Sequence, residues 1–483
     1  MVSDSITPFH WNVIKSEWIC SEPSQRLDAN FYAKDIVEAR ILLNRMKEKG
    51  VKLKTLNDPS FVSQIFWPAR FKRKYAADEN GRPFLTPKEI FQFLIKPSKF
   101  IVDPPENLLI KEKWILVTRS GSIGRCLIAN TILSNYVVSD DLIRIILNDE
   151  KYLGYIYAFL NTWIGQAFLT KTPYGETVKH IEPEHIANIP LPLLSESDLK
   201  EINEKILEAY KLREEAQKLL LEAEKIFRKE LELPLLHDNS IDYFGGENGK
   251  LIKAFTLNSD EFFTSQIRLN AYSYMPISRY TRKTLNERKG KYNLKKLGDP
   301  EVSRKVFTPP RFKRIYVKNE KEGIPLLQGS HIPMLKYFDI KLIWNKMENL
   351  NEYIIKRNWI LVTCSGTIGR VFLVSKLCEG WAATNHMTRI IPSEKINAGY
   401  LTIFLQSPYG LSQLQTLIYG GVVEELGEAG ELLSEILVPI PSDTAQEKIG
   451  NLVIEAYEKK DQANMLENKA VKALEEKLVE AAK

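Results

Sequence analysis

The sequence predicts an α+β fold in which one mixed α/β domain occurs twice, each copy followed by a long helix. Three observations predict it: an ordered internal repeat, a proline-marked strand late in each copy, and a heptad-like apolar spacing after that strand. We expect the two long helices to pack as an antiparallel coiled coil with pseudo-twofold symmetry. The predicted segments are a first mixed domain (1–194), a helix (195–231), a linker (232–251), a second mixed domain (252–441) and a helix (442–483).

The repeat pairs whole motifs, in order, at an offset of about half the chain. Such a long period indicates a duplicated domain and excludes a solenoid, whose repeats span roughly 20–50 residues. The paired motifs are WILVTRSGSIGR (Trp114–Arg125) with WILVTCSGTIGR (Trp359–Arg370), RFKRKY (Arg70–Tyr75) with RFKRIY (Arg311–Tyr316), RLDANFY (Arg26–Tyr32) with RLNAYSY (Arg268–Tyr274), and GYIYAFL (Gly154–Leu160) with GYLTIFL (Gly399–Leu405).

The composition is that of a soluble globular protein of several domains. The chain has 483 residues, of which 44% are apolar and 27% charged, and its net charge is +6. A mildly basic chain can bind nucleic acid but need not do so. None of the four cysteines stands at CxxC spacing, so neither a zinc ribbon nor a redox pair is indicated. We see no secretion signal and no membrane-spanning run, and we expect a cytoplasmic protein without a membrane partner.

Each predicted helix carries an apolar seam with steps of three and four residues. The first seam is Leu199, Ile202, Ile206, Ala209, Leu212, Ala216, Leu219, Ala223 and Ile226. The second is Ile449, Leu452, Ala456, Ala463, Leu466, Ala470 and Leu474. Lys459 and Lys460 interrupt the second seam in this interpretation. The two seams can bury each other, or each can dock on a partner.

The basic segment RFKR occurs in both copies. Read as a strand, Arg70–Tyr75 alternates cations on one face with aromatic residues on the other. Cations on one face can contact phosphates, although a solvated edge strand that uses lysines against aggregation fits the same pattern. Recurrence in both copies favours DNA contact. The candidate DNA-binding residues are Arg70, Lys72, Arg73, Lys74, Arg311, Lys313 and Arg314.

A glycine turn ending in arginine follows an apolar run in each copy. Its amides, with Arg125 or Arg370, are candidates to meet a phosphate; the alternative is a tight turn with a structural arginine. Beyond the turn, Asp140 and Asp141 align with Asn385 and His386. Because the second copy lacks the paired carboxylates, shared catalysis is not indicated. Divergent polar residues on a common frame are typical of two readers of different base sequences, and we count Asp140, Asn385 and His386 as candidate base contacts.

Enzyme signatures are incomplete in this sequence. Gly245–Lys250 resembles a P-loop, but its spacing fails by one residue, and Asp103–Glu106 resembles an amino-methyltransferase motif without its aromatic residue. The histidines form no metal motif, and His180 and His185 are expected at the surface or at a helix cap. The sequence therefore predicts a protein that binds rather than catalyses, with no catalytic residue and no metal site.

The doubled architecture resembles the specificity (S) subunit of type I restriction–modification systems. The resemblance covers nearly the whole chain and rests on the duplicated RFKR and SGxIGR motifs, on Tyr174-Gly175 and Tyr419-Gly420, and on the strands IPLPLL (Ile189–Leu194) and VPIP (Val438–Pro441) that precede the helices. No single motif is diagnostic of the family.

The resemblance implies two target recognition domains that read the halves of a split DNA sequence. It also implies two DNA adenine methyltransferase subunits docked on the helices, and a translocating nuclease subunit as a further partner. It implies that this chain binds no cofactor, whereas its partners bind S-adenosylmethionine, ATP and Mg²⁺. Alternatives are a duplicated coiled-coil scaffold for proteins, and a diverged nuclease or methyltransferase. The family's base-reading residues lie in variable loops, so the candidate residues above rest on the repeat alone.

Overall fold

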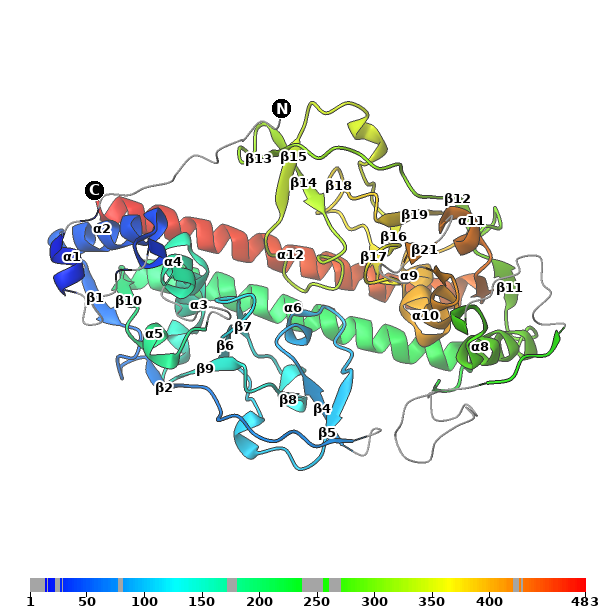
Figure 1. Ribbon diagram of the computed structural model, residues 1–483, viewed down its shortest axis with the longest axis horizontal. Helices are drawn as coiled ribbons and strands as arrows, with labels where there is room; N and C mark the ends of the chain where they lie inside the picture. The colour runs from blue at the N-terminus through cyan, green and yellow to red at the C-terminus, as the bar shows by residue number, and fades with distance from the viewer. Residues whose placement is uncertain are drawn as a thin grey trace, which may run out of the picture. The chain divides into compact units, whose positions relative to one another are not determined.

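The protein is described by a computed structural model, in which the chain forms two compact units. The first unit comprises residues within 1–91, 95–214 and 462–483, and the second comprises 92–94 and 215–461. The two long helices, α6 (Glu196–Glu230) and α12 (Asp443–Ala481), are green and red in Figure 1. Each helix contributes one part to each unit. The described residues are 14, 16–21, 27, 29–76, 81–171, 180–236, 255–259, 271–419, 425–426 and 429–483.

Several predicted features lie wholly or partly outside the described residues. They are Arg26, Arg268, the pair Tyr174-Gly175, Gly420, and most of the predicted linker with its P-loop-like segment Gly245–Lys250.

The first unit is built on short strands. It has two four-stranded sheets, and β1 pairs with β10. The sheet whose strands are longer on average, here called the larger sheet, has the order β2-β9-β6-β7, and the other, the smaller sheet, has the order β3-β5-β4-β8. The strands are β1 Lys52–Thr55, β2 Val62–Phe66, β3 Tyr75–Ala76, β4 Arg82–Leu85, β5 Lys99–Ile101, β6 Ile115–Thr118, β7 Cys126–Ile128, β8 Val137–Val138, β9 Leu142–Leu147 and β10 Pro190–Leu193. The helices before α6 are α1 Ser16–Ser21, α2 Lys34–Glu48, α3 Leu153–Asn161, α4 Trp163–Lys171 and α5 Pro183–Ala187.

The second unit repeats the same sheets in the same strand order. The larger sheet is β12-β19-β16-β17, the smaller is β13-β15-β14-β18, and β11 pairs with β22. The strands are β11 Asn293–Lys296, β12 Ser303–Phe307, β13 Tyr316–Val317, β14 Gly323–Leu327, β15 Lys341–Trp344, β16 Ile360–Thr363, β17 Val371–Leu373, β18 Ala382–Ala383, β19 Met387–Pro392, β20 Ile418–Tyr419, β21 Glu425–Leu426 and β22 Leu437–Ile440. The helices are α8 Pro276–Glu287, α9 Ala398–Gln406, α10 Pro408–Gln415 and α11 Ala429–Ser434.

The duplication extends to local irregularities. The register between β2 and β9 shifts between Val62 and Gln64, and that between β12 and β19 shifts between Ser303 and Lys305. Because a bulge in the same place of both sheets cannot follow from composition alone, the two domains have the same backbone architecture. The prediction of an α+β fold with two homologous domains is confirmed.

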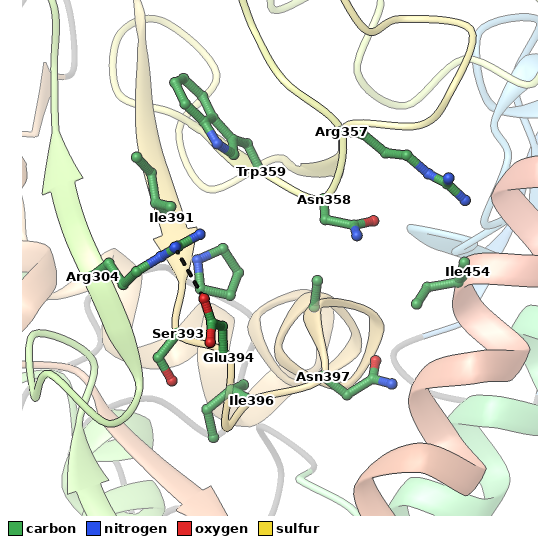
Figure 2. Close-up of a pocket in the computed structure, with 12 residues that line it drawn as sticks. Arg304, Arg357, Asn358, Trp359, Ile391, Ser393, Glu394, Ile396, Asn397 and Ile454 are labelled. Carbon is green, nitrogen blue, oxygen red and sulfur yellow. Dashed lines mark ion pairs between the residues drawn. The ribbon is translucent and has the colours of Figure 1, made fainter.

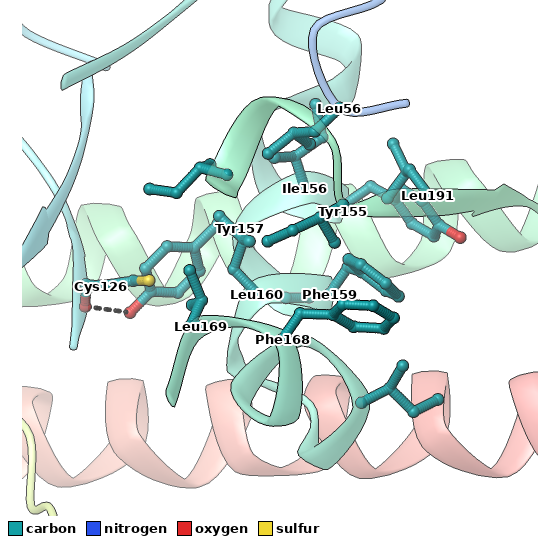
Figure 3. Close-up of a cluster of buried hydrophobic side chains, with 14 of the residues drawn as sticks. Leu56, Cys126, Tyr155, Ile156, Tyr157, Phe159, Leu160, Phe168, Leu169 and Leu191 are labelled. Atoms are coloured by element: carbon teal, nitrogen blue, oxygen red, sulfur yellow. Dashed lines mark hydrogen bonds between the residues drawn. The ribbon is translucent and has the colours of Figure 1, made fainter. Parts of the chain in front are cut away.

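The core of the first unit gathers around α3, which is apolar on all sides. Tyr155, Ile156, Phe159 and Leu160 are buried there together with residues of the sheet and of α12, and Figure 3 shows these side chains interdigitating. The Tyr157 hydroxyl donates to the Cys126 carbonyl at 3.5 Å. A helix that is hydrophobic all round is stable only when it is covered on every face, and here the sheet and the long helices provide that cover.

Glycine lets each mixed domain approach its long helix closely. A Cβ at Gly154 of α3 would lie 2.6 Å from the Asn203 carbonyl of α6, and one at Gly399 of α9 would lie 2.1 Å from the Gly450 carbonyl of α12. No real Cβ tolerates such distances. The glycine that opens the repeated GYxxxFL motif is therefore required by backbone contact.

The long helices run antiparallel within each unit, as predicted. In the first unit, Lys477 contacts Asp198, whereas Arg213, further along α6, contacts Glu467. In the second unit, Glu215 pairs with Lys459 at 2.8 Å, and Glu230 of α6 pairs with Lys448 at 2.8 Å. The α12 partner numbers fall as the α6 numbers rise, which defines the antiparallel direction.

The seams differ in part from the prediction. Buried positions of α6 that follow steps of four and three are Ile202, Ile206, Ala209, Arg213, Ala216, Leu220, Ala223 and Phe227. Those of α12 are Ile449, Val453, Ala456, Lys460, Ala463, Glu467, Ala470 and Leu474. The predicted Leu212, Leu219, Ile226, Leu452 and Leu466 are only half-buried. The heptad spacing is regular only when three buried charged residues, Arg213, Lys460 and Glu467, are counted as core positions. A search for apolar residues alone does not find them.

Lys460 does not interrupt the second seam, contrary to the prediction. Its side chain is fully buried, and its ammonium donates to the Tyr337 hydroxyl at 2.9 Å. The ammonium also lies 4.8–5.1 Å from the ring centroids of Phe93, Tyr337, Phe372 and Tyr457. Burial lowers the pKa of Lys460, while Asp461 and Cys378 oppose that shift. Aromatic faces can hold a desolvated cation, so the seam continues through a caged lysine.

The cage gives a testable difference between two substitutions. Lys460→Ala should lower the free energy of unfolding of the second unit by about 2–5 kcal/mol, because it leaves a cavity among four rings. Lys460→Met fills a similar volume without a buried charge and should cost less than about 1 kcal/mol. Hydrogen exchange of the α12 amides around residue 460 measures both. If Lys460→Met proves as damaging as Lys460→Ala, the ammonium itself stabilises the unit.

Among the described residues, no helix is both long and apolar enough to cross a bilayer.

Candidate functional site

The two RFKR segments are not strands, contrary to the prediction. Only their final tyrosines, Tyr75 and Tyr316, enter strands β3 and β13. Residues 67–74 and 308–315 have no regular structure. Prolines precede both segments (Pro68, and the pair 309–310), and proline removes a ladder donor, which keeps the incoming chain out of the sheet.

The burial of the second segment alternates as the strand interpretation suggested, whereas in the first segment Phe71 is half-buried and residues 72–75 are exposed. Phe71 packs on the core of the smaller sheet in the first domain, and Phe312 does so in the second. The Phe312 ring lies 3.9 Å from the Tyr353 ring, centroid to centroid. Each segment is thus anchored by one aromatic side chain. The exposed side chains between and beside the anchors are Arg70, Lys72, Arg73, Lys74, Arg311, Lys313 and Ile315.

The second arginine of each segment pairs with a candidate base contact, although the Arg73 side chain stays 36% exposed. Arg73 Nη2 lies 2.5 Å from Asp140 Oδ1, and Arg314 Nη2 lies 3.2 Å from Asn385 Oδ1. Asp140 and Asn385 are 7% and 8% exposed, so neither presents its side chain at the surface. Burial opposes the charge of Arg73, but the hydrogen bond to Asp140 raises its pKa above the ordinary value. These four predicted residues meet each other within their own domains.

An exposed tyrosine covered by a lysine closes each segment. Tyr75 is 48% exposed and Tyr316 is 47% exposed. Lys99 Nζ lies 5.2 Å from the Tyr75 ring centroid, and Lys341 Nζ lies 5.1 Å from that of Tyr316. Sequence reasoning missed these pairs because the lysines stand on neighbouring strands, β5 and β15. The recurrence of the tyrosine in both motifs was the available signal.

The SGxIGR turns are shaped by threonine and glycine. Gly124 and Gly369 both have φ +80°, a conformation that favours glycine, and their amides donate to the Thr118 and Thr363 carbonyls. The amide of Arg125 donates to the Thr118 hydroxyl at 3.0 Å. These amides are engaged within the turn, as a tight structural turn requires.

The arginine of the second turn also has an internal partner. The Arg370 guanidinium donates to the Gly329 carbonyl at 2.9 Å, and burial lowers its pKa. This contact fits the alternative interpretation, in which the arginine serves the structure of its own domain.

The side chains around the two turns differ although the backbone is the same. In the first domain, Arg119 contacts Glu182 and lies 4.4 Å from the Trp67 ring centroid, while Ser120 donates to Asp141. In the second domain, Cys364 replaces Arg119. There His386 replaces Asp141, and Arg311 lies 3.9 Å from Glu425. Burial and the nearby Arg314 and Arg311 lower the pKa of His386, which favours the neutral imidazole.

A fully buried arginine beneath each candidate surface was also missed. Arg144 in β9 and Arg389 in β19 are 0% exposed and occupy the same register, opposite Leu116 and Leu361. The repeated Arg-Ile-Ile in an otherwise apolar run was the available signal.

A pocket of about 330 Å³ lies in the second unit and is lined by Arg304, Arg357 and Trp359 among others (Figure 2). Its two arginines are already paired: Arg304 Nη1 lies 3.5 Å from Glu394, as the dashed line in Figure 2 shows, and Arg357 Nη2 lies 2.5 Å from Glu458. We assign no ligand to this pocket, because its charged groups are satisfied within the chain.

Among the described residues, no group of three or more His, Cys, Asp or Glu side chains is placed to hold a metal ion. His185 accepts from the Glu182 amide at 2.9 Å in the capping box of α5, so the prediction of a helix-cap histidine is confirmed.

Most of the chain matches one protein family. Residues 50–222 and 306–471 match the family described as "Type I restriction modification DNA specificity domain". Among solved structures, the S subunit of a type I restriction–modification system from M. genitalium is 12% identical, with a TM-score of 0.36, over 90% of this chain and 96% of that one. The HsdS subunit from Thermoanaerobacter tengcongensis is 11% identical, with a TM-score of 0.27, over 89% and 96%. A comparison with curated proteins returns no significant match.

Proposed function

The chain belongs to the type I restriction–modification DNA specificity family, in which it is a DNA sequence-recognition subunit, and we propose that its two domains read the two halves of a bipartite DNA target. The observation that carries the proposal is that the two domains share one backbone architecture but differ in the side chains beside the SGxIGR turns. The sheets, the turns and the anchored RFKR segments repeat, whereas Arg119 and Asp141 are replaced by Cys364 and His386. A shared frame positions each domain on the duplex, and divergent side chains specify different bases.

We assign the phosphate contacts to the outward cations of the RFKR segments, Arg70, Lys72, Lys74, Arg311 and Lys313. In the part of the chain that the structure describes, Arg70, Lys72, Lys74 and Lys313 are exposed and have no carboxylate partner. Lys99 and Lys341 add a cation beside each exposed tyrosine. Such groups bind the sugar–phosphate backbone without sequence preference.

For base contacts we favour Asp141 and His386, which lie beside the SGxIGR turns, over Asp140 and Asn385. Asp140 and Asn385 are buried against Arg73 and Arg314, whereas Asp141, which accepts from Ser120, keeps 32% of its side chain exposed. Asp141 and His386 are half-buried and stand beside the exposed glycine turns. The Arg370 guanidinium donates to the Gly329 carbonyl, so we do not assign it to phosphate, and Arg125 stays a candidate from its place at the end of the first turn.

Within a type I complex, we propose that the chain itself is non-catalytic. Two DNA adenine methyltransferase subunits would bring S-adenosylmethionine, and a translocating nuclease subunit would bring ATP and Mg²⁺. Copurification of such subunits with the tagged full chain tests this assembly. Catalysis by the purified chain alone would contradict it.

A methylation map of the host genome, with and without the gene, tests the recognition role directly. Loss of N6-methyladenine at one split, asymmetric motif is the expected result. A scaffold for proteins would leave the map unchanged although the gene is expressed and its partners assemble.

Exchange of the first mixed domain tests whether the two domains act separately. Residues within 1–194 are replaced by those of another family member while α6 and α12 are kept, so that the helix seam is unchanged. Only one half of the methylated motif should change, because the other reader is intact. The matched control exchanges residues within 252–441 and should change only the other half. If either exchange alters both halves together, the two-reader proposal is wrong.

A further inference from the structure

Each domain contains a buried guanidinium whose described partners are main-chain carbonyls. Arg144 donates to the carbonyls of Val138 at 3.2 Å, Ser139 at 3.1 Å and Leu142 at 2.5 Å. Burial lowers its pKa to about 10, and Asp140 opposes that shift, so the group stays charged at neutral pH. Burying a charge costs several kcal/mol unless hydrogen bonds satisfy it.

The second domain repeats the arrangement carbonyl by carbonyl. Arg389 donates to the carbonyls of Ala383 at 2.7 Å, Thr384 at 2.9 Å and Met387. Burial lowers the pKa of Arg389 to about 10. The three acceptors occupy the same places relative to Arg389 as those of the first domain do relative to Arg144. The buried arginine is energetically costly, yet both domains have it although the side chains beside their turns differ. We infer that it supports the shared architecture of the domain rather than the reading of one base sequence.

One of the three carbonyls in each domain belongs to the other sheet, and a second belongs to the residue that follows it in the chain. Arg144 stands in β9 of the larger sheet, whereas Val138 ends β8, which pairs with β4 of the smaller sheet through Phe84 and Val137. Arg389 in β19 reaches Ala383 at the end of β18 in the same way. The guanidinium therefore joins the larger sheet to the smaller sheet, which carries the exposed tyrosine and the end of the RFKR segment.

The residue that follows these carbonyls in each domain contacts the RFKR segment. Directly after Ser139, Asp140 accepts from Arg73, and directly after Thr384, Asn385 accepts from Arg314. Arg73 lies 5.4 Å from the Phe84 ring centroid, over the same smaller sheet. A chain of contacts thus runs from the buried arginine through the loop to the basic segment.

We propose that Arg144 and Arg389 are positioning residues that fix each smaller sheet, with its basic segment, for contact with duplex DNA. Asp140 and Asn385 complete this device by holding Arg73 and Arg314. The inference rests on the proposed function for the role of the segment. The mechanical link between the sheets does not depend on DNA.

Arg144→Lys tests the device in the full chain, because lysine keeps the charge but loses the planar fork that spans several carbonyls. Hydrogen exchange in β4 and β5 should rise about tenfold, as expected for the loss of about one net hydrogen bond, while β6 stays protected. The DNA probe is a duplex selected from a random-sequence pool by the wild-type chain. The variant should bind this probe about tenfold more weakly and lose discrimination at one half-site only.

Control variants separate positioning from general instability. Arg45→Lys, an exposed substitution on α2, should match the wild type in both measurements. Arg389→Lys should affect the other half-site. If Arg144→Lys proves too unstable, Asp140→Ala weakens the same link from its outer end, and Asp140→Asn should retain more discrimination because asparagine performs this role in the second domain.

The outcomes are distinct. Unchanged exchange in β4 and β5 overturns the inference, and so does equal loss at both half-sites with a lowered unfolding temperature. If the wild-type chain selects no duplex at all, the proposed function fails, whereas the exchange result still decides whether the arginine holds the smaller sheet.

Discussion

Replacing Arg70, Lys72 and Lys74 together by alanine is expected to weaken DNA binding by about 10–100-fold at moderate salt. Each neutralised phosphate contributes about 0.9 to the slope of log affinity against log salt, so the slope should fall by roughly 3. The fold should be unaffected because all three side chains are exposed, while Phe71 and Arg73 remain to anchor the segment. Fluorescence anisotropy across a salt series, with the full chain and a long duplex, measures both quantities.

A control with the same change in net charge isolates the position of the cations. Lys34, Lys151 and Lys200 are exposed lysines elsewhere in the first unit, with side chains 81%, 65% and 76% exposed. Their triple alanine variant should leave the salt slope within about 1 of the wild type. Equal slopes for the two triple variants would mean that the RFKR segment is ordinary solvated surface.

Glu467→Ala is expected to destabilise the first unit by about 3–5 kcal/mol. Glu467 is 1% exposed and accepts from the Arg213 guanidinium, which also donates to Asn464 at 2.8 Å. The Tyr157 hydroxyl lies 3.2 Å from the same carboxylate. Burial opposes the charge of Arg213, but the carboxylate raises its pKa above the ordinary value. Removing the carboxylate leaves a buried, uncompensated charge, and hydrogen exchange across residues 202–213 of α6 should report the loss.

Two further variants show whether the cost comes from the broken pair. Lys477→Ala removes a surface contact with Asp198 and should cost less than about 1 kcal/mol. Arg213→Met with Glu467→Leu replaces the pair by apolar side chains of similar size and should recover most of the stability. If the double variant is as unstable as Glu467→Ala, the ion pair stabilises the unit more than apolar side chains of similar size do.

The repeat made the architecture predictable, and helix periodicity fixed much of the seam. The prediction was wrong where a charged residue occupies a core position. Arg213 and Glu467 satisfy each other across α6 and α12, and Lys460 is held by aromatic rings from distant segments. A hydrophobicity pattern cannot detect such partners, because burial of a charge depends on residues far away in the sequence.

The candidate site was predictable only in outline. The RFKR motifs located the exposed cations, and their alternation correctly separated Phe71 from Lys72. The contact between Arg73 and Asp140 joins residues far apart in the sequence, and no local pattern connects them. Arg144 was overlooked because an arginine inside an apolar strand conflicts with ordinary strand patterning, and it is explained only by the carbonyls of Val138, Ser139 and Leu142 that accept from it.

The first unit is completed by the last residues of the chain. Ala470, Leu474, Leu478 and Ala482 of the C-terminal segment belong to the same core as Ile202 and Tyr155. During synthesis on the ribosome, the first domain therefore emerges long before the side chains that cover it. Its apolar surface must stay open, or be shielded by a chaperone, until residues 462–483 have been made. A nonsense mutation ahead of residue 470 would consequently impair the domain that was made first.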